Sequence, residues 1–405
     1  MSELSYLEKL LDGVEVEWRN LGDTSLFEIA NNGRKPVKAS LRIAGETPYY
    51  GANNIQDYVD GYTHDGEYVL IAEDGSASLE NYSIQYATGK FWANNHVHVV
   101  RGKERVHSRF LYHYLCIVNF LPFLTGGGRA KLTKGQLIEI PVPIPCPDNP
   151  EKSLAIQSEI VRILDKFTAL TAELTAELNM RKKQYNYYRD QLLSFDDEQE
   201  KPIYLEKLLD GVEVEWKLLG DASFFEIANN GRKPVKSSLR IAGKTPYYGA
   251  NNIQDYVDGH THDGEYVLIA EDGSASLERY SIQYVTGKFW ANNHVHVVRG
   301  KTRVNSRFLF HYLHIVNFIP FLTGGVRAKL TKGQLIEISV PIPCPDNTEK
   351  SLAIQAEIVR ILDKFDTLTN SITEGLPREI ELRQKQYEYY RDLLFSFPKP
   401  ETASN

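Results

Sequence analysis

The chain has 405 residues, of which 42% are hydrophobic and 24% charged, and its formal net charge is −7. Its length allows two or three domains, each with its own core, and its composition is ordinary for a soluble globular protein. No run of about 18 apolar residues predicts a transmembrane helix. Taken alone, the negative charge argues weakly against binding to nucleic acid, for which a basic domain is expected, although a net charge can hide a local basic patch.

The cysteines and the start of the chain indicate the compartment. Cys146 and Cys344 occupy the same position of a repeat, and Cys116 is unmatched. This pattern gives neither a disulfide framework nor a zinc spacing. The acidic, amphipathic start, MSELSYLEKLLDG, lacks the basic-then-apolar order of a signal peptide. We therefore expect a protein of the reducing cytoplasm, with no membrane partner.

The first part of the chain predicts an α+β or mostly β globular domain. Between residues 12 and 147, β-type runs such as EYVLIAEDG and FWANNHVHVV alternate with turn sequences such as GANN, EDGS and TGGGR. The prolines of PVPIPCPDNP then stop regular structure. We place the first domain at residues 1–150.

A long helix is predicted over residues 151–198. Its apolar residues recur at steps of three and four from Ile156 to Phe195, with one stutter near Arg181. This spacing is that of a coiled-coil seam. The 43 residues from Ser153 to Phe195 would extend about 64 Å if wholly helical.

The chain then repeats itself. Residues 6–167 align with residues 204–365 at a constant offset of 198, and 18 of the 162 aligned positions differ. The second domain therefore falls at 199–348, and a second long helix with a C-terminal tail at 349–405. The second helix has four extra residues, among which Gly375 and Pro377 should interrupt it.

The apolar stripe of each helix must be covered. Packing the two helices on each other is the simplest solution, and twofold-related copies in one chain favour an antiparallel pair. The alternative is that each helix packs only on its own domain. The predicted fold class is α+β, with two globular, mixed or mostly β domains joined by two long antiparallel coiled-coil helices in a pseudo-twofold arrangement.

Two like domains at a fixed separation suit duplex DNA, because a twofold protein matches an inverted repeat. A rod of about 60 Å corresponds to under two turns of B-DNA, so two short half-sites with an unread gap would fit. Basic residues neutralise phosphates, and side-chain amides read base edges. The candidate DNA-binding residues of the first copy are Arg34, Lys35, Lys38, Arg42, Asn53, Asn54, Gln56, Asn94, Asn95, Arg101, Lys103, Arg105, Arg129, Lys131 and Lys134.

Each of these candidates has an identical counterpart in the second copy. The alternative interpretation is that the charges form solvated faces and the asparagines form turns. The counterparts are Arg232, Lys233, Lys236, Arg240, Asn251, Asn252, Gln254, Asn292, Asn293, Arg299, Lys301, Arg303, Arg327, Lys329 and Lys332.

Catalytic alternatives find little support. His96 and His98 alternate on one face of a strand, but no cysteine or carboxylate lies at a ligand spacing, which favours buried or hydrogen-bonded histidines. Glu73 and Asp74 form a pair better explained as a strand-end turn. AGKT at 242–245 lacks the earlier glycine of a phosphate-binding loop. We therefore expect no catalytic residue and no metal in this chain.

Taken together, several motifs resemble the specificity subunit of type I restriction-modification enzymes, type IC members in particular. The resemblance covers essentially the whole chain. Its motifs are VEWRNLGD, TPYYGANNIQDYVDG, EYVLIAEDG, GKFWANNHVHVV, LTKGQLIEIPVPIP, the helix from SLAIQSEIVRILDKF to QLLSF, and LPREIELRQKQYEYYRDLLFSF.

The resemblance implies a bacterial, non-catalytic subunit with two target-recognition domains, each reading half of a bipartite DNA site. It implies that the helices set the spacing of the half-sites and dock two modification subunits, which methylate adenine. Restriction subunits would add cleavage. S-adenosylmethionine, ATP and magnesium are expected in those partner subunits and no cofactor in this chain.

One departure from the family pattern matters. Members usually carry two different recognition domains, whereas here the two are nearly identical. We therefore expect both to read the same half-site, so that the full target is a gapped palindrome. The alternative function is a stand-alone DNA- or protein-binding scaffold without a methyltransferase partner.

Overall fold

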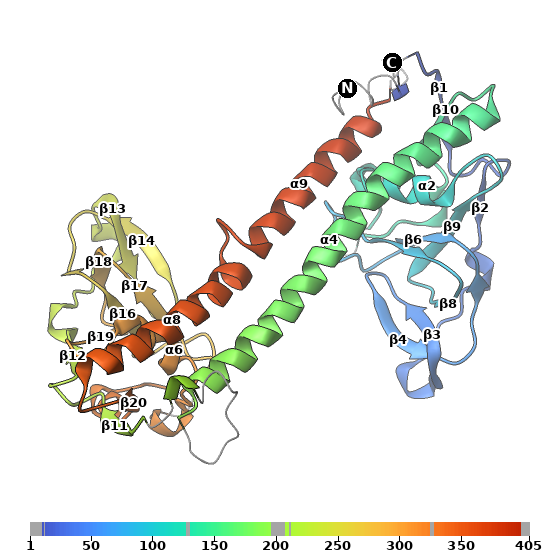
Figure 1. Cartoon of the computed structure of the whole chain (residues 1–405). Helices are drawn as coiled ribbons and strands as arrows, with labels where there is room; N and C mark the ends of the chain where they lie inside the picture. The colour runs from blue at the N-terminus through green and yellow to red at the C-terminus, as the bar shows by residue number, and fades with distance from the viewer. Residues whose placement is uncertain are drawn as a thin grey trace. The chain divides into compact units, whose positions relative to one another are not determined.

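A computed structural model describes residues 10–11, 13–126, 130–195, 207–209, 212–324 and 328–397. The chain divides into two compact units (Figure 1). The first unit comprises Met1–Leu174 and Glu379–Asn405, and the second comprises Thr175–Arg378. Each unit therefore holds one copy of the repeated domain and parts of two long helices. Within the described ranges, no helix is both long and apolar enough to cross a lipid bilayer.

In its described residues, the domain of the first unit contains three small sheets. One pairs two strands in the order β1-β10, and the other two have the orders β2-β9-β6-β7 and β4-β3-β8-β5. The strands are β1 (Val16–Asn20), β2 (Phe27–Ile29), β3 (Ala44–Tyr50), β4 (Ile55–Val59), β5 (His64–Asp65), β6 (Tyr68–Ala72), β7 (Ile84–Ala87), β8 (Lys90–Ala93), β9 (Val97–Gly102) and β10 (Pro141–Pro145).

The central strands explain the β-type runs of the sequence. Every residue of β6, YVLIA, is buried, as are the first four residues of β9, VHVV. The two strands pair antiparallel, with Leu70 opposite Val99. One face of this sheet is covered by helix α2 (Ser108–Leu115), whose Phe110 and Leu111 are fully buried. A short helix, α3 (Lys134–Leu137), follows.

The second unit repeats this architecture strand for strand. Its sheets have the orders β11-β20, β12-β19-β16-β17 and β14-β13-β18-β15. Its elements are β11 (Val214–Leu218), β12 (Phe225–Ile227), β13 (Ala242–Tyr248), β14 (Ile253–Val257), β15 (His262–Asp263), β16 (Tyr266–Ala270), β17 (Ile282–Val285), β18 (Lys288–Ala291), β19 (Val295–Gly300), α6 (Ser306–Leu313), α7 (Lys332–Leu335) and β20 (Ser339–Pro343).

The long helices follow the prediction closely. Helix α4 (Pro150–Leu193) runs unbroken for 44 residues. The second long helix is interrupted as expected, with α8 (Thr348–Asn370) and α9 (Leu376–Leu394) separated by a short loop. Gly375 in this loop has φ +84, and a Cβ there would lie 2.4 Å from the carbonyl oxygen of Thr367, so only glycine fits.

In the first unit, α4 packs both on its own domain and on the other long helix. Leu164 of α4 is fully buried in the same core as Leu394 of α9. The two helices run in opposite directions there (Figure 1), and Phe167 stacks on Tyr390 with centroids 5.2 Å apart. The two packing modes weighed for the sequence thus occur together.

The second unit contains the counterpart contacts, but there the phenylalanine comes from the second copy and the tyrosine from the first. Tyr188 of α4 stacks on Phe365 of α8 with centroids 5.5 Å apart. Leu192 and Phe195, which lies just beyond the end of α4, enter the core of this unit. Phe365 and Tyr188 are the repeat counterparts of Phe167 and Tyr390, so one pair of residue types makes both contacts.

His113 joins α2 to both long helices in the first unit. Its imidazole is fully buried, with Nε2 2.8 Å from Oδ1 of Asp165 and Nδ1 3.3 Å from the hydroxyl of Tyr387. Burial lowers the pKa of His113 to about 4, an effect that Asp165 opposes and that Arg109 reinforces. The folded chain therefore holds this imidazole neutral where the unfolded chain binds a proton.

We expect the first unit to lose stability as the pH falls from about 6.5 to about 4, by at most about 1.4 kcal/mol per pH unit from this residue. His113→Gln should make that dependence shallower, because the site no longer titrates. Denaturant unfolding followed across this pH range measures the slope. His260→Gln, which removes an exposed imidazole, is the control. An unchanged slope in His113→Gln would contradict the assignment.

Candidate nucleic-acid interface

Four loops of the first domain meet beside the start of β9. The Asn53 side chain donates to the carbonyl of Gly75 at 2.9 Å, and the backbone N–H of Asn94 donates to Tyr50 at 3.2 Å. The N–H of Leu132 donates to the carbonyl of Glu73 at 2.8 Å. We call this region the loop cluster, and it consists of Asn53–Gln56, Glu73–Gly75, Asn94–His96 and Lys131–Lys134.

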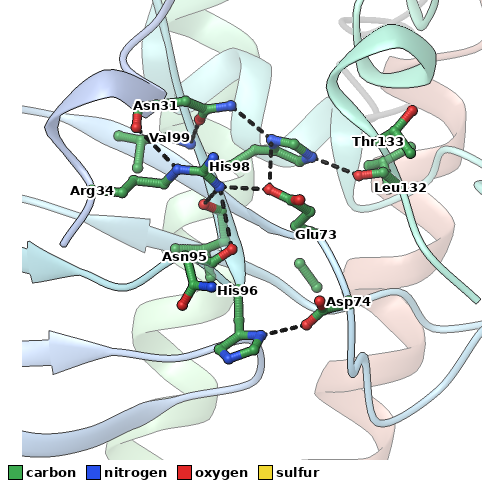
Figure 2. Close-up of polar contacts among 12 residues, drawn as sticks. Asn31, Arg34, Glu73, Asp74, Asn95, His96, His98, Val99, Leu132 and Thr133 are labelled. Atoms are coloured by element: carbon green, nitrogen blue, oxygen red, sulfur yellow. Dashed lines mark hydrogen bonds and ion pairs between the residues drawn. The ribbon is translucent and has the colours of Figure 1, made fainter. Parts of the chain in front are cut away.

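Glu73 is the ionic centre of the loop cluster (Figure 2). One carboxylate oxygen accepts a 2.6 Å hydrogen bond from Arg34 Nη1, and the other lies 3.0 Å from Lys131 Nζ. Burial raises the pKa of Glu73, but the hydrogen bonds from Arg34 and Lys131 outweigh it and hold the pKa below its ordinary value. This single carboxylate therefore forms ion pairs with two of the predicted DNA-binding cations.

The two histidines of this region have separate environments. His98 is fully buried, with Nδ1 2.9 Å from the amide nitrogen of Asn31 and Nε2 2.7 Å from the carbonyl oxygen of Leu132. Burial lowers the pKa of His98, so it is a neutral, hydrogen-bonded core residue. His96 is exposed and bonds Asp74 at 2.5 Å. In the part of the chain that the structure describes, no group of three or more His, Cys, Asp or Glu is arranged to hold a metal ion.

Two of the predicted amides are used within the fold. The carbonyl oxygen of the Asn53 side chain accepts bonds from Ala77 N at 2.8 Å and Ser83 Oγ at 2.5 Å. Asn94 is only 4% exposed, and its side chain accepts from the N–H of His96 at 2.8 Å. The remaining amides of the cluster, those of Asn54, Gln56 and Asn95, are exposed.

A basic cluster formed by the predicted residues Arg101, Lys103 and Arg105 lies toward the other end of β9, which extends about 17 Å. Arg101 bonds Glu28 at 2.6 Å, and Lys103 Nζ donates to the carbonyl of Thr24 at 2.5 Å. Arg105 donates to the carbonyl of Pro147, just before α4. The structure thus separates this cluster from the loop cluster and uses it to tie β9 to its neighbours.

Arg42, another predicted residue, lies over the ring of Tyr49 at 4.2 Å and bonds Asp57 at 3.3 Å. Arg129 and Arg327 lie outside the described residues. The exposed lysines Lys35, Lys38 and Lys134 have no ion-pair partner among the residues described. Among the predicted residues of the first copy that the structure describes, these three lysines and the three exposed amides are free to meet a ligand.

Sequence reasoning missed an apolar pocket beside Lys35. It has a volume of about 270 Å³, and its walls include Ile43, Tyr49 and Trp92. Ile43 is 71% exposed. The isolated apolar residues of SLRIAG, which lie within a basic stretch, are the feature of the sequence that could have indicated this pocket. The second copy has the same pocket with a volume of about 260 Å³.

The second loop cluster, Asn251–Gln254, Glu271–Gly273, Asn292–His294 and Lys329–Lys332, matches the first. Arg232 bonds Glu271 at 2.5 Å, and Lys329 lies 3.0 Å from the same carboxylate. The exposed groups of the second copy that match those of the first, in this cluster and in the basic segment before it, are Lys233, Lys236, Lys332, Asn252, Gln254 and Asn293. The chain therefore presents one local surface twice.

Glu73→Gln is expected to lower the free energy of unfolding by about 1–3 kcal/mol at neutral pH, because it leaves Arg34 and Lys131 without a carboxylate. The stabilisation is present above the ordinary pKa of glutamate and is lost as the pH falls through the lowered pKa of Glu73. The difference between variant and wild type should therefore shrink in acid. Glu80→Gln, at an exposed site, should change stability by less than about 0.5 kcal/mol.

Several known proteins are similar to this chain in sequence. The model of the type I restriction modification DNA specificity domain matches twice, at residues 14–181 and 213–382. A putative type I restriction enzyme specificity subunit of Haemophilus influenzae is 47% identical over 410 residues, which cover 97% of this chain and 98% of the relative. The EcoR124I/EcoR124II specificity subunit of Escherichia coli is 38% identical over 441 residues, covering 100% of both chains.

A solved structure agrees in fold. The crystal structure of the S subunit of a type I restriction-modification system from M. genitalium superposes with a TM-score of 0.64 at 16% identity, covering 96% of this chain and 98% of that one. The domain model matches each half of the chain, and the relatives are similar to it over its full length. The chain belongs to the specificity subunits of type I restriction-modification enzymes and carries two copies of their DNA specificity domain.

Proposed function

We propose that the two loop clusters read identical half-sites, so that the complete target is a gapped palindrome. The chain is the DNA-recognition component of its complex and catalyses no reaction itself. The observation that carries the proposal is the identity of the exposed groups in the two clusters, together with the repeated Arg–Glu–Lys contacts beneath them. Two domains that present the same exposed side chains on the same fold should bind the same DNA half-site.

The exposed groups divide by chemistry. Lysines are suited to neutralising phosphates and giving affinity without sequence preference. Amides donate and accept together, as the edge of adenine requires. We assign Lys35, Lys38 and Lys134 to the DNA backbone, and Asn54, Gln56 and Asn95 to base edges.

The differences between the copies support equal half-sites. Glu46 and its counterpart Lys244 lie in strand β3 and its copy, outside the loop clusters. Tyr62, replaced by His260, lies after β4, with Lys90 over its ring at 4.8 Å. No exposed amide or lysine of either cluster is among the 18 differing positions.

We further propose that the long helices space the half-sites and dock two modification subunits, with restriction subunits joining for cleavage in the bacterial cytoplasm. S-adenosylmethionine, ATP and magnesium would be bound by those partners, and the target adenine would be flipped into a modification subunit. Exposed aromatic residues at counterpart positions support docking, because such residues are enriched in interfaces. Tyr187 of α4 is 57% exposed, and Tyr389 of α9 is 54% exposed.

Co-expression with a type I modification subunit, followed by base-modification sequencing, tests the function. We expect methylated adenine within a gapped palindromic motif. A gapped but asymmetric motif would contradict equal half-sites and assign specificity to the differing positions. Absence of any motif, with a complex demonstrably formed, would favour a scaffold without a methyltransferase role.

The phosphate assignment predicts a salt effect. Lys35→Gln combined with Lys233→Gln should weaken binding of the assembled complex to its site. It should also reduce the slope of log K against log salt by up to about 1.8, since each lost phosphate contact removes about 0.9. Lys166→Gln with Lys364→Gln, exposed helix residues at counterpart positions, is the matched control and should leave the slope unchanged. Equal slopes for both double variants would refute the assignment.

A further inference from the structure

The second unit contains a polar cleft of about 640 Å³ beside helix α4. We call it the α4 cleft. One wall is the last part of α4, with Lys182 and Arg189, and another is the segment leading into β17, with Arg279 and Tyr280. Asn251 of the second loop cluster also lines the cleft. The cleft therefore borders the surface assigned to DNA.

Cations dominate the cleft. Lys182, Arg189 and Arg279 face a single acid, Glu278, which gives a formal charge of +2. Arg189 is engaged by Asp190 at 2.7 Å. Lys182 and Arg279 are exposed, and neither has an ion-pair partner among the residues that the structure describes. Such unopposed cations in one concavity attract an anion.

The two units also differ at a tyrosine that lines the cleft. Tyr280 lines the cleft and is 6% exposed, and its hydroxyl has no hydrogen-bond partner within the described ranges. In the first unit, the hydroxyl of the counterpart Tyr82 donates to the carbonyl of Ala72 at 3.0 Å. A buried hydroxyl without a partner is unfavourable. The two units therefore differ at this hydroxyl as well as in the charges around the cleft.

The first unit has different chemistry at the counterpart positions. Gln384 replaces Lys182, Glu388 replaces Asn186, and Asn81 replaces Arg279, while Arg391 matches Arg189 and Glu80 matches Glu278. The formal charge at these positions is −1 in the first unit. Two units that agree at 144 of 162 aligned positions thus differ by three charges around one cleft.

We propose that the α4 cleft binds a backbone phosphate of the DNA held by the second unit, and that the first unit makes no such contact. The inference rests on the proposed DNA-reading role of the loop clusters. Phosphate oxygens only accept hydrogen bonds, and the cleft offers charged donors from Lys182 and Arg279. The second unit thus binds its half-site more tightly than the first unit binds the identical half-site.

Salt titration of DNA binding by the assembled complex tests the proposal, with Lys182→Gln and Arg279→Asn combined to install the first unit's residues. We expect at least a several-fold loss of affinity and a slope of log K against log salt reduced by up to about 0.9, the value for one lost phosphate contact. Lys183→Gln with Lys364→Gln, exposed lysines of the same unit outside the cleft, is the control. The reciprocal change, Gln384→Lys with Asn81→Arg, should steepen the slope.

The outcomes separate the alternatives. A wild-type slope in the cleft variant, with the methylation motif intact, overturns the cleft proposal and leaves the proposed function standing. Loss of assembly with the modification subunits by the folded variant shows a protein partner and overturns it as well. Pyrophosphate binding without DNA that the variant loses, combined with an unchanged slope, assigns the cleft to a free phosphoester instead. Failure of the wild-type complex to bind any duplex defeats the proposed function itself.

Discussion

The cost of exposing an apolar stripe along α4 is the constraint on which the architecture depends. A helix of 44 residues is far longer than one face of its domain, so no single domain can cover it. The first part of the helix enters the core of one unit through Leu164, and its end enters the core of the other through Leu192. The cores of the two repeated domains are completed by helices that begin elsewhere in the chain.

A second constraint acts at the loop clusters. Loops that meet a charged ligand must be held in place without a large apolar core of their own. Glu73 solves this by joining Arg34 and Lys131, which come from distant parts of the chain, and His98 fixes the carbonyl of Leu132 from beneath. Arg34 and Lys131 are thus held by an ion pair within the fold, whereas the exposed lysines Lys35, Lys38 and Lys134 have no such partner among the described residues.

The parts of this structure that were predictable have local causes. The long helix and the interruption at Gly375 follow from heptad spacing and from the behaviour of glycine and proline, which are visible in short windows. The repeat needs only a comparison of the sequence with itself. The division of the basic residues into structural and free groups was not predictable. Arg101 and Lys35 look alike in the sequence, and only strand pairing, which places Arg101 opposite Glu28, distinguishes them. The α4 cleft was not predictable either, because its cations lie almost 100 residues apart in the chain and only the fold brings them together.

The exchanged stacking contacts have a consequence for inheritance. Phe167 with Tyr390 and Phe365 with Tyr188 are one residue pairing used twice. A recombination event that copies a stretch of one repeat over the other therefore returns a chain in which both helix junctions still fit. Gene conversion between the two halves is structurally silent at these junctions, so the fold itself allows the repeats to be kept alike.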